Sequence, residues 1–240
     1  MASGGRKSGS GNSTGKKGGA ARQLHTKVKT ARGRKTSSTL WLQRQLNDPY
    51  VAQSKVDGYR SRAAYKLRDL DDKFRFLKPG MRVVDLGSAP GGWSQIAADR
   101  IRSTEPNGHE VIAVDLQDVD DLTGVQFMKL DLREPEAAAV LKAAAGGKVD
   151  VVVSDMAPST TGHGSTDHIR IVLLVEIALD LALDILLPGG TFVAKVFKGG
   201  AEGDMLIALK ANFESVKHAK PPSSRPESAE TYVVALGFRG

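Results

Sequence analysis

The sequence predicts an α/β fold, a doubly wound parallel sheet with helices on both faces, from three observations. Beyond residue 80, short apolar runs alternate with segments of helical periodicity. Such alternation is typical of parallel strands joined by helices that cover both faces of the sheet. A glycine-rich turn follows the first apolar run, and aspartates close several of the later ones. Because ligands of these sheets bind beyond the carboxyl ends of the strands, we expect a functional site at that edge.

The expected strands are short and apolar, and they cover residues 82–86, 110–115, 125–128, 149–154, 191–197, 214–219 and 230–237. The expected helices keep a spacing of three and four between apolar residues and cover residues 38–46, 61–74, 92–102, 134–145, 167–187 and 202–212, with a further helix opening at Pro49. Ser61 is the expected cap of the second of these helices. Residues 220–229 join the last two strands without a helix, so these two strands should be antiparallel.

The N-terminal segment differs in composition from the rest of the chain. Of the 34 Lys and Arg, eleven lie in residues 1–47, ahead of the first acid, Asp48, which leaves 23 basic residues against 27 acids. We expect residues 1–37 to be a disordered basic tail and residues 38–240 to form one domain. The tail could bind RNA phosphates by counterion release. A solvated tail without a specific role and a mitochondrial transit peptide are the alternatives.

Composition excludes several classes of protein. The chain has no cysteine, which removes disulfides, thiolate nucleophiles and cysteine-bound metals. No apolar run approaches the ~20 residues of a membrane helix, and there is no secretory signal, so a cytoplasmic location is expected. His163 and His168 lack carboxylate partners nearby in sequence, and no metal is expected. Nothing in the sequence demands a dimer, so a monomer is expected.

The glycine-rich turn spans residues 85–93 and reads Asp-Leu-Gly-Ser-Ala-Pro-Gly-Gly-Trp. Its spacing is neither the G-x-G-x-x-G of dinucleotide sites nor that of a phosphate loop. Asp115, at the end of the second strand, suits a ribose diol, and Asp131, after the third, could meet an adenine amino group. The pattern favours S-adenosylmethionine over NAD, although helix capping or turn formation would be simpler roles for both aspartates.

Four charged residues stand where an ordinary fold would not put a charge. Lys195 lies within the apolar run 191–197, where a lysine must be paired. Lys66 borders the apolar stripe of its helix, Asp155 closes the fourth strand and Glu230 opens the last one. The structural alternatives are a buried ion pair for Lys195, a lysine that snorkels along its helix for Lys66, and an ordinary strand-opening acid for Glu230.

Four motifs occur in an order that resembles the FtsJ-like family of RNA 2′-O-ribose methyltransferases. They are SRAAYKL at 61–67, VDLGSAPGGWSQ at 84–95, SDMAP at 154–158 and VAKVF at 193–197, and the resemblance extends from about residue 41 to the C-terminus. The resemblance implies a Rossmann-like sheet of seven strands in the order 3-2-1-4-5-7-6 with the last strand reversed. It implies S-adenosylmethionine as cofactor, bound at Gly91, Trp93, Asp115, Asp131 and Asp155. Its implied catalytic residues are Lys66, Asp155, Lys195 and Glu230.

In that strand order Asp155, Lys195 and Glu230 lie on neighbouring strands, within roughly 10 Å of one another. Methyl transfer to a ribose 2′-OH needs an aimed hydroxyl, a path for its proton and stabilisation of the developing charge on oxygen. We expect Lys195 to contact the hydroxyl, as a base or as a donor that fixes a lone pair. Asp155 would orient Lys195, while Lys66 and Glu230 would complete the network and hold the target nucleotide.

The resemblance implies, as the expected substrate, a uridine of 23S ribosomal RNA within the large ribosomal subunit. Transfer RNA or a messenger cap would keep the chemistry and change the substrate. A non-catalytic RNA-binding or assembly factor on the same scaffold is the alternative from another class of protein. An NAD-dependent reductase is disfavoured by the glycine spacing.

Overall fold

The computed structural model describes residues 1–2, 36–158, 164–197 and 202–240. The chain forms two units, Met1–Asn47 and Asp48–Gly240. The regular structure described in the first unit is α1 (Thr36–Leu46). The expected basic tail, residues 1–37, lies almost entirely outside the described residues, so its disorder and its boundary with the domain stay predictions.

The second unit is built on one sheet of seven strands in the order β3-β2-β1-β4-β5-β7-β6. The strands are β1 (Val83–Leu86), β2 (Val111–Asp115), β3 (Val125–Lys129), β4 (Val149–Ser154), β5 (Leu186–Phe197), β6 (Phe213–Ala219) and β7 (Glu230–Phe238). Strands β1 to β5 pair in parallel, whereas β7 is antiparallel to both β5 and β6. The predicted fold class, strand order and reversed last strand are confirmed.

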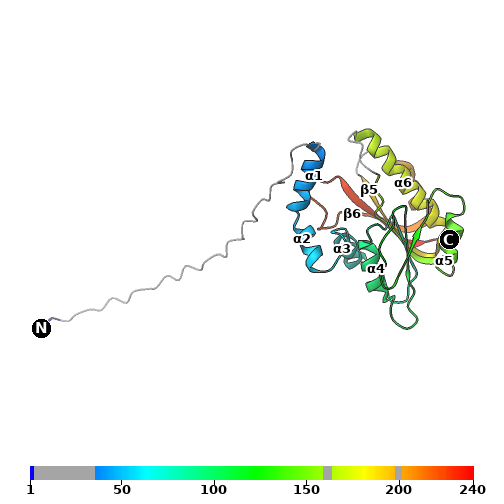
Figure 1. Cartoon of the computed structure of the whole chain (residues 1–240), viewed down its shortest axis with the longest axis horizontal. Coiled ribbons are helices and arrows are strands. Elements are labelled where there is room, and N and C mark those ends of the chain that lie inside the picture. Colours follow the sequence, from blue (N-terminus) through cyan, green and yellow to red (C-terminus); the bar gives the residue numbers. More distant parts are fainter. Residues whose placement is uncertain (3–35, 159–163, 198–201) are drawn as a thin grey trace. The chain divides into compact units, whose positions relative to one another are not determined.

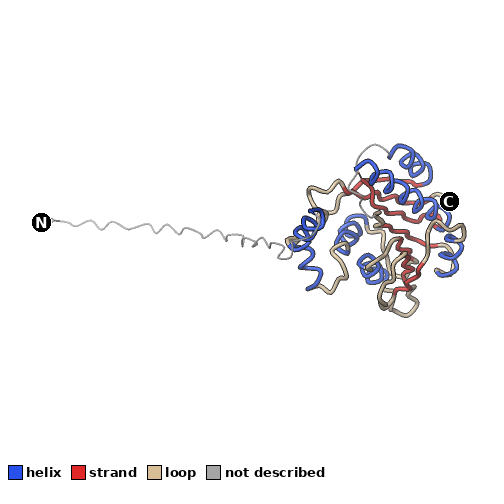
Figure 2. Tube along the Cα trace, turned by 45° about the horizontal axis from the view of Figure 1, so that its top comes forward, coloured by secondary structure: helices blue, strands red, loops and turns tan. Residues whose placement is uncertain are grey.

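Helices pack against both faces of this sheet, which forms the central layer in Figures 1 and 2. The helices of the unit are α2 (Pro49–Val56), α3 (Ala64–Phe74), α4 (Gly92–Ile101), α5 (Ala137–Ala144), α6 (Gly164–Ile185) and α7 (Glu202–Asn212). One apolar core joins the sheet to α5, α6 and α7, and a second joins its other face to α3 and α4. Strand side chains alternate between the two cores, since successive residues of a strand point to opposite faces.

The alternation along β5 decides where Lys195 points. Phe192, Ala194 and Val196 belong to the core under α5, α6 and α7, whereas Val193 belongs to the core under α3 and α4. Lys195, two residues after Val193, therefore points to the same side as α3. The sequence thus places a lysine at the end of the second core, where it can meet a side chain from α3.

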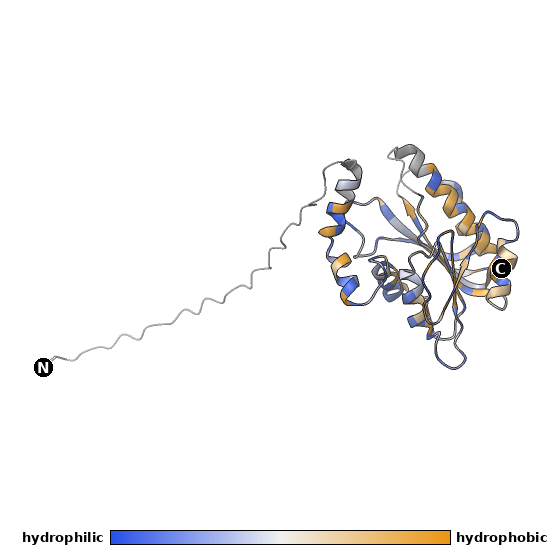
Figure 3. Ribbon diagram, viewed as in Figure 1, coloured by the Kyte–Doolittle hydropathy of each residue, from blue (hydrophilic) through white to orange (hydrophobic). Residues whose placement is uncertain are grey.

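Helix α6 shows how the first core is closed. Its buried residues cluster at a spacing of about three to four positions, with some neighbours in pairs: Ile171, Val175, Ala178, Leu179, Leu181, Ala182 and Ile185. Figure 3 shows α6 as a largely hydrophobic helix, in orange, with hydrophilic segments in blue. Burying each of the large side chains contributes about 1.5–3 kcal/mol.

None of the helices in the described residues is long and apolar enough to cross a membrane.

Most element boundaries differ from the sequence prediction by one to five residues, and the local contacts of α5, β5 and α3 show what lies at three of them. Helix α5 begins at Ala137 rather than residue 134, because turns closed by the amides of Glu134 and Ala137 precede it. Strand β5 begins at Leu186, which pairs with Val149 ahead of a register shift. Helix α3 begins at Ala64, and the expected cap by Ser61 is wrong. The Ser61 side chain instead packs against Gly92.

Candidate active site

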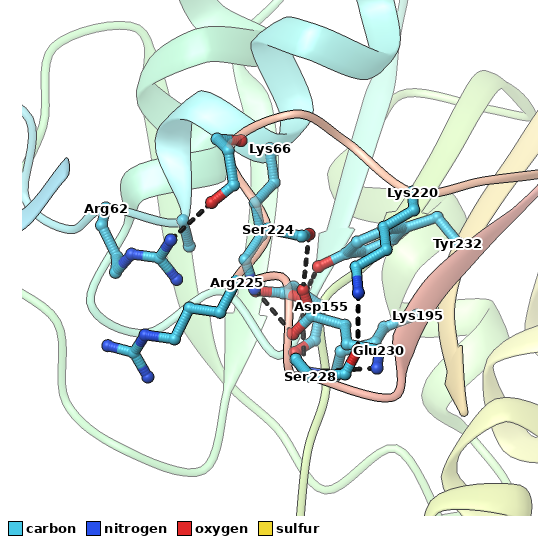
Figure 4. Close-up of polar contacts among 12 residues, drawn as sticks. Arg62, Lys66, Asp155, Lys195, Lys220, Ser224, Arg225, Ser228, Glu230 and Tyr232 are labelled. Atoms are coloured by element: carbon cyan, nitrogen blue, oxygen red, sulfur yellow. Dashed lines mark hydrogen bonds and ion pairs between the residues drawn. The ribbon is translucent and has the colours of Figure 1, made fainter. Parts of the chain in front are cut away.

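Four charged side chains from distant parts of the sequence meet at the carboxyl edge of the sheet (Figure 4). Nζ of Lys66, from α3, lies 2.8 Å from Oε2 of Glu230 and 4.0 Å from Oδ2 of Asp155. Nζ of Lys195, from β5, lies 3.2 Å from Oδ1 of Asp155 and also donates to the Asp155 main-chain oxygen. The structure therefore brings together all four residues that sequence analysis singled out as a catalytic set.

Strand pairing explains why these side chains converge. Ser154 at the end of β4 pairs with Ala194 of β5, so Asp155 follows directly beside Lys195. On the other side of β5, Phe197 pairs with Glu230, the first residue of β7. Because β7 runs antiparallel to β5, its first residue comes to the edge at which the parallel strands end. Topology, rather than proximity in sequence, assembles the cluster.

Both lysines are almost completely buried. Lys66 is 7% and Lys195 is 6% exposed, a degree of burial that ammonium groups tolerate only when they are paired. An ammonium carries three N–H donors. Two acceptors on Asp155 contact Lys195 among the described residues, which leaves one donor for a further group. Lys195 is thus fixed in direction and still able to contact a ligand.

Asp155 is the acid that joins the two lysines. Burial acts to raise the pKa of Asp155, but Lys195, then Lys66, and the hydroxyl of Tyr232 outweigh that effect and hold the pKa below its ordinary value. The group is therefore a carboxylate at neutral pH. Its Oδ1 accepts from the Tyr232 hydroxyl at 2.8 Å, and Oδ2 is turned toward Lys66.

Tyr232 is the member of the site that sequence analysis missed. It pairs directly with Lys195 across β5 and β7, and its ring lies 5.6 Å from that of Trp93 and 5.8 Å from Nζ of Lys66. Burial, followed by the charges of Asp155 and Glu230, raises the pKa of Tyr232 well above its ordinary value, so the hydroxyl stays a donor. The signal was present, because residues two apart on a strand share a face and Glu230 is two residues away.

The loop between β6 and β7 holds Glu230 in place. Ser224 donates to Oε1 of Glu230 at 3.0 Å, and the Glu230 amide contacts Oγ of Ser228 at 3.2 Å. Lys220 closes the loop through the carbonyl oxygens of Pro226 and Ser228. Arg225 attaches it to Asp48, at the start of α2, with an Nε to Oδ2 distance of 2.9 Å. Both carboxylate oxygens of Glu230 therefore accept a hydrogen bond, Oε2 from Lys66 and Oε1 from Ser224.

The glycine turn between β1 and α4 lies at the same edge of the sheet. Gly87 and Gly91 have φ angles of 73° and 104°, in the left-handed region that favours glycine. A Cβ atom at Gly87 would collide with Met156, and one at Gly92 would collide with Ser61. The amides at the start of α4, including that of Trp93, belong to a first helical turn, whose N–H groups have no partner within the helix.

Several buried oxygens around this turn have no hydrogen-bond partner among the described residues. They are Oγ of Ser61, Oγ of Ser88 and Oδ1 of Asp85. Burial raises the pKa of Asp85 to about 7, opposed by the hydrogen bond from Ser94 and reinforced by the carboxylates of Asp155 and Asp115. Unpartnered buried oxygens beside free helical amides fit a polar ligand with both donors and acceptors.

The three remaining residues predicted to bind the cofactor, Asp115, Asp131 and Trp93, have hydrogen-bond partners within the protein. Asp115, at the end of β2, accepts from the amides of Ala89 and Gln117, both at 2.9 Å, which ties it to the glycine turn. The carboxylate of Asp131 faces Arg133, whose side chain and then whose amide lower the pKa of Asp131 to about 2. The Trp93 indole is buried and donates to the Ala63 oxygen at 2.9 Å, which leaves its backbone to face a ligand.

Metal ligation finds no support in the described part of the chain. Its His, Asp and Glu side chains do not form a group of three or more that could hold a metal ion. Of the two histidines considered from the sequence, His163 lies outside the described residues, and the side chain of His168 is not described.

Known proteins resemble the chain in both sequence and structure. Ribosomal RNA large subunit methyltransferase E from Paramagnetospirillum magneticum is 58% identical over 242 residues, covering 100% of this chain and 99% of the relative. The protein of that name from Rhodopseudomonas palustris BisA53 is 60% identical, covering 91% and 92%. A crystal structure described as a ribosomal RNA methyltransferase from Plasmodium falciparum superposes with a TM-score of 0.66 at 29% identity, covering 76% of this chain and 100% of that one.

The match at the level of the family covers the whole site. The FtsJ-like methyltransferase family matches residues 59–238, a range that begins before α3 and ends within β7. It contains the glycine turn and all four of the clustered charges. The chain belongs to the FtsJ-like methyltransferase family.

Proposed function

We propose that this protein transfers a methyl group from S-adenosylmethionine to the 2′-hydroxyl of a ribose in RNA, most specifically of a uridine in 23S ribosomal RNA of the large subunit. The observation that carries the proposal is the buried ammonium of Lys195. Asp155 holds it through two acceptors, and among the residues that the structure describes no further hydrogen bond takes its third donor. The names of the relatives support ribosomal RNA as the class of substrate.

The cofactor would supply an electrophilic methyl group on a sulfonium. We infer that the backbone at Gly91 and Trp93 and the unpartnered oxygens near the turn hold its methionine end. Asp115 would receive the ribose diol, Asp131 the adenine, and Asp155 would lie at the methyl end. The mixture of free amides and buried oxygens around the turn supports this assignment, because S-adenosylmethionine presents both an ammonium and a carboxylate.

Lys195 would act on the incoming hydroxyl. Both of its contacts on Asp155 are acceptors, so Lys195 is the donor to them, and as an ammonium it would keep a third N–H. Its remaining N–H would hold one lone pair of the hydroxyl oxygen and leave the other aimed at the methyl carbon. S-adenosylmethionine would supply the methyl carbon and take the bonding electrons onto its sulfur as the hydroxyl oxygen forms the new bond, and the hydroxyl proton would leave to water. Fixing this line of attack can contribute several kcal/mol.

Lys66 and Glu230 would hold the nucleotide that carries the hydroxyl. In their ion pair, Nζ of Lys66 lies 4.0 Å from Oδ2 of Asp155. The Lys66–Glu230 pair and the Lys195–Asp155 pair therefore interact electrostatically. A cation beside the developing oxygen charge lowers the barrier more in a buried site than in water. In this arrangement the four charges act as one unit, with Lys195 closest to the reaction.

The partner would be ribosomal RNA, reached in part through the basic N-terminal segment, and the protein would act as a cytoplasmic monomer. Removal of residues 1–35 takes away ten of the eleven basic residues that precede Asp48. We expect the shortened protein to bind RNA more weakly. The slope of log affinity against log salt concentration should become shallower by about 0.7–0.9 for each phosphate contact that is lost. Filter binding at several salt concentrations measures the slope, and an unchanged slope would contradict a role of the segment in binding.

Transfer of a labelled methyl group tests the function. Purified large subunits, free 23S RNA and total transfer RNA are incubated with labelled S-adenosylmethionine and the wild-type protein, Lys195→Ala or Lys142→Ala. Lys142 is the matched control, a lysine of α5 paired with Asp184 at 3.7 Å. We expect label at an alkali-resistant ribose position of ribosomal RNA, present with Lys142→Ala and lost with Lys195→Ala.

The other outcomes would each change the conclusion. Label in transfer RNA alone would keep the mechanism and replace the substrate. Cofactor binding without label in any RNA would favour a binding or assembly factor on a methyltransferase scaffold. Equal loss of cofactor affinity and turnover in Lys195→Ala would make Lys195 a structural ion-pair residue.

A further inference from the structure

Arg60 joins three segments around the predicted nucleoside end of the cofactor site. It lies in the connection between α2 and α3, ahead of the four catalytic candidates. Its Nη1 donates to the carbonyl oxygen of Asp120 at 2.6 Å, and its Nη2 donates to that of Asp121 at 2.6 Å. Nη1 also reaches the carbonyl oxygen of Pro90, in the glycine turn, at 3.4 Å. One guanidinium thus ties the segment after β2 to the turn after β1.

The position of Arg60 is itself fixed. Its main-chain amide donates to Oε1 of Gln95 at 2.7 Å, and Nε2 of the same glutamine donates to the Gly58 oxygen at 3.0 Å. The guanidinium carbon lies 5.6 Å from the ring centre of Phe127, on β3. Nη1 is also close to Gly91, where an added Cβ atom would lie 3.0 Å from it. Backbone, stacking and packing contacts together hold the side chain against the turn.

The segment that Arg60 holds begins with Asp115, the expected partner of the ribose. The carboxylate of Asp115 accepts from Ala89 in the glycine turn, so its direction depends on how the turn and the segment meet. Lys129 holds the middle of the segment through Asp118, at 2.9 Å, and Arg60 holds its end. Leu116, beside Asp115, is 59% exposed and offers an apolar surface at this place.

The chemistry of these contacts indicates positioning rather than charge recognition. All three acceptors of the Arg60 guanidinium are backbone carbonyls, which a planar fork of donors can hold in a fixed geometry. Among the described residues Arg60 forms no ion pair. A cation at this place would not attract a sulfonium cofactor, so any contribution to binding must come from the shape of the segment.

We propose that Arg60 is a positioning residue for the cofactor, which keeps residues 115–121 docked on the glycine turn so that the nucleoside pocket is formed before binding. This rests on the proposed function, since it assumes S-adenosylmethionine at that edge. Pre-formed pockets bind more tightly because less ordering accompanies binding. The alternative for an arginine on this protein is a contact with RNA phosphate, and the two roles make different predictions.

The test uses Arg60→Lys, which keeps the positive charge but loses the planar set of N–H donors of the guanidinium, together with Arg60→Ala. Dissociation constants for S-adenosylmethionine and S-adenosylhomocysteine are measured by calorimetry on the full chain. We expect both ligands to bind about tenfold more weakly to Arg60→Lys, by the same factor, since both carry the nucleoside. At saturating cofactor kcat should stay within about twofold of wild type, and the salt slope of RNA binding should not change.

Arg102→Lys is the matched control, an arginine that is 59% exposed and paired with Glu105 at 3.6 Å, and it should bind both ligands as the wild type does. Unchanged cofactor affinity in Arg60→Lys would overturn the inference. So would a shallower salt slope in Arg60→Ala with cofactor affinity intact, which would assign Arg60 to RNA. Failure of the wild-type protein to bind either ligand would overturn the proposed function as well, and is thereby distinguished from failure of the inference alone.

Discussion

The two ends of the carboxyl edge hold their charges in different ways. At the end formed by β4, β5 and β7, Lys66, Asp155, Lys195 and Glu230 are held by side chains of residues far away in sequence. At the end formed by β1, β2 and β3, Asp115 and Asp131 are held by backbone amides and by a near neighbour, Arg133. The first arrangement exists only in the folded protein, whereas the second is largely local.

This difference bears on which substitutions should change turnover and which should change cofactor affinity. A buried ion pair loses most when one partner is removed, because the other charge is left without compensation. A carboxylate on an exposed turn keeps water as an alternative partner. We therefore expect substitutions at the first end to change turnover strongly, and substitutions at the second end to change cofactor affinity modestly.

Asp85 connects the two ends, since the charges of Asp155 from one and of Asp115 from the other both raise its pKa, and it gives the largest expected effect. Burial raises the pKa of Asp85 to about 7, whereas an unfolded carboxyl titrates near 4. The folded state therefore holds this proton more tightly, and the group's contribution to stability falls as pH rises from about 4 to about 7.

Asp85→Asn, which keeps an acceptor for Ser94, should remove this penalty. The gain in the free energy of unfolding should be greater at pH 8 than at pH 4 by up to about 4 kcal/mol, given the pKa of about 7 for Asp85. Urea unfolding at the two pH values measures it, with exposed Asp99→Asn as the control. A gain that is equal at both pH values would show that folding leaves the pKa of Asp85 near that of the unfolded carboxyl, and would contradict the prediction.

A tenfold effect is expected from Tyr232, at the first end. Tyr232→Phe removes only the hydroxyl that donates to Oδ1 of Asp155. The pKa of Asp155 should then rise, since one of the groups that lower it is gone, and the acid limb of the pH–rate profile should move to higher pH. We expect kcat to fall about tenfold, the effect of one hydrogen bond to a charged group.

The pH–rate profile separates this role from simple packing. Tyr59→Phe, at a tyrosine whose ring meets that of Tyr65, is the control and should leave the profile in place. A lower kcat in Tyr232→Phe without a shift of the acid limb would mean that the hydroxyl does not act through Asp155.

The smallest effect is expected from Asp131, at the second end. Its carboxylate is already paired with Arg133, so Asp131→Asn should weaken binding of S-adenosylmethionine only about two- to threefold. Calorimetry measures the change, and Arg133→Gln, which frees the carboxylate, is the matched variant. A loss above about thirtyfold would show that Asp131 leaves Arg133 to bind the cofactor directly, and the two ends would then be alike.

The end that holds the four clustered charges could be predicted because its residues break local rules. A lysine within the apolar run of β5 and an acid at the end of β4 are conspicuous in sequence, and parallel topology brings strand ends together. The strand order, however, came from the family resemblance, since hydrophobic periodicity does not specify which strands are neighbours. The antiparallel pair of β6 and β7 followed from a connection, residues 220–229, in which no helix was expected.

Arg60 could not be found by the same reasoning, and the one sequence signal for Tyr232 is its place two residues after Glu230, on the same face of the strand. A tyrosine in the apolar run of β7 is expected in any core, and only the pairing with Lys195 shows what its hydroxyl contacts. Arg60 contacts carbonyl oxygens some sixty residues away, and backbone acceptors leave no mark in a sequence. The error at Ser61 has a related cause, because the packing of the glycine turn outweighs the capping preference of serine.

The central claim is that the four charges act as one unit, and a double-mutant cycle tests it most directly. Single-turnover rates of methyl transfer are measured for the wild type, Lys66→Ala, Lys195→Ala and the double variant at saturating S-adenosylmethionine. We predict that Lys195→Ala loses about 10³-fold or more and that the double variant is no slower than Lys195→Ala alone, since residues of one unit are not additive. Losses that multiply in the double variant would show two independent contributions and contradict the account.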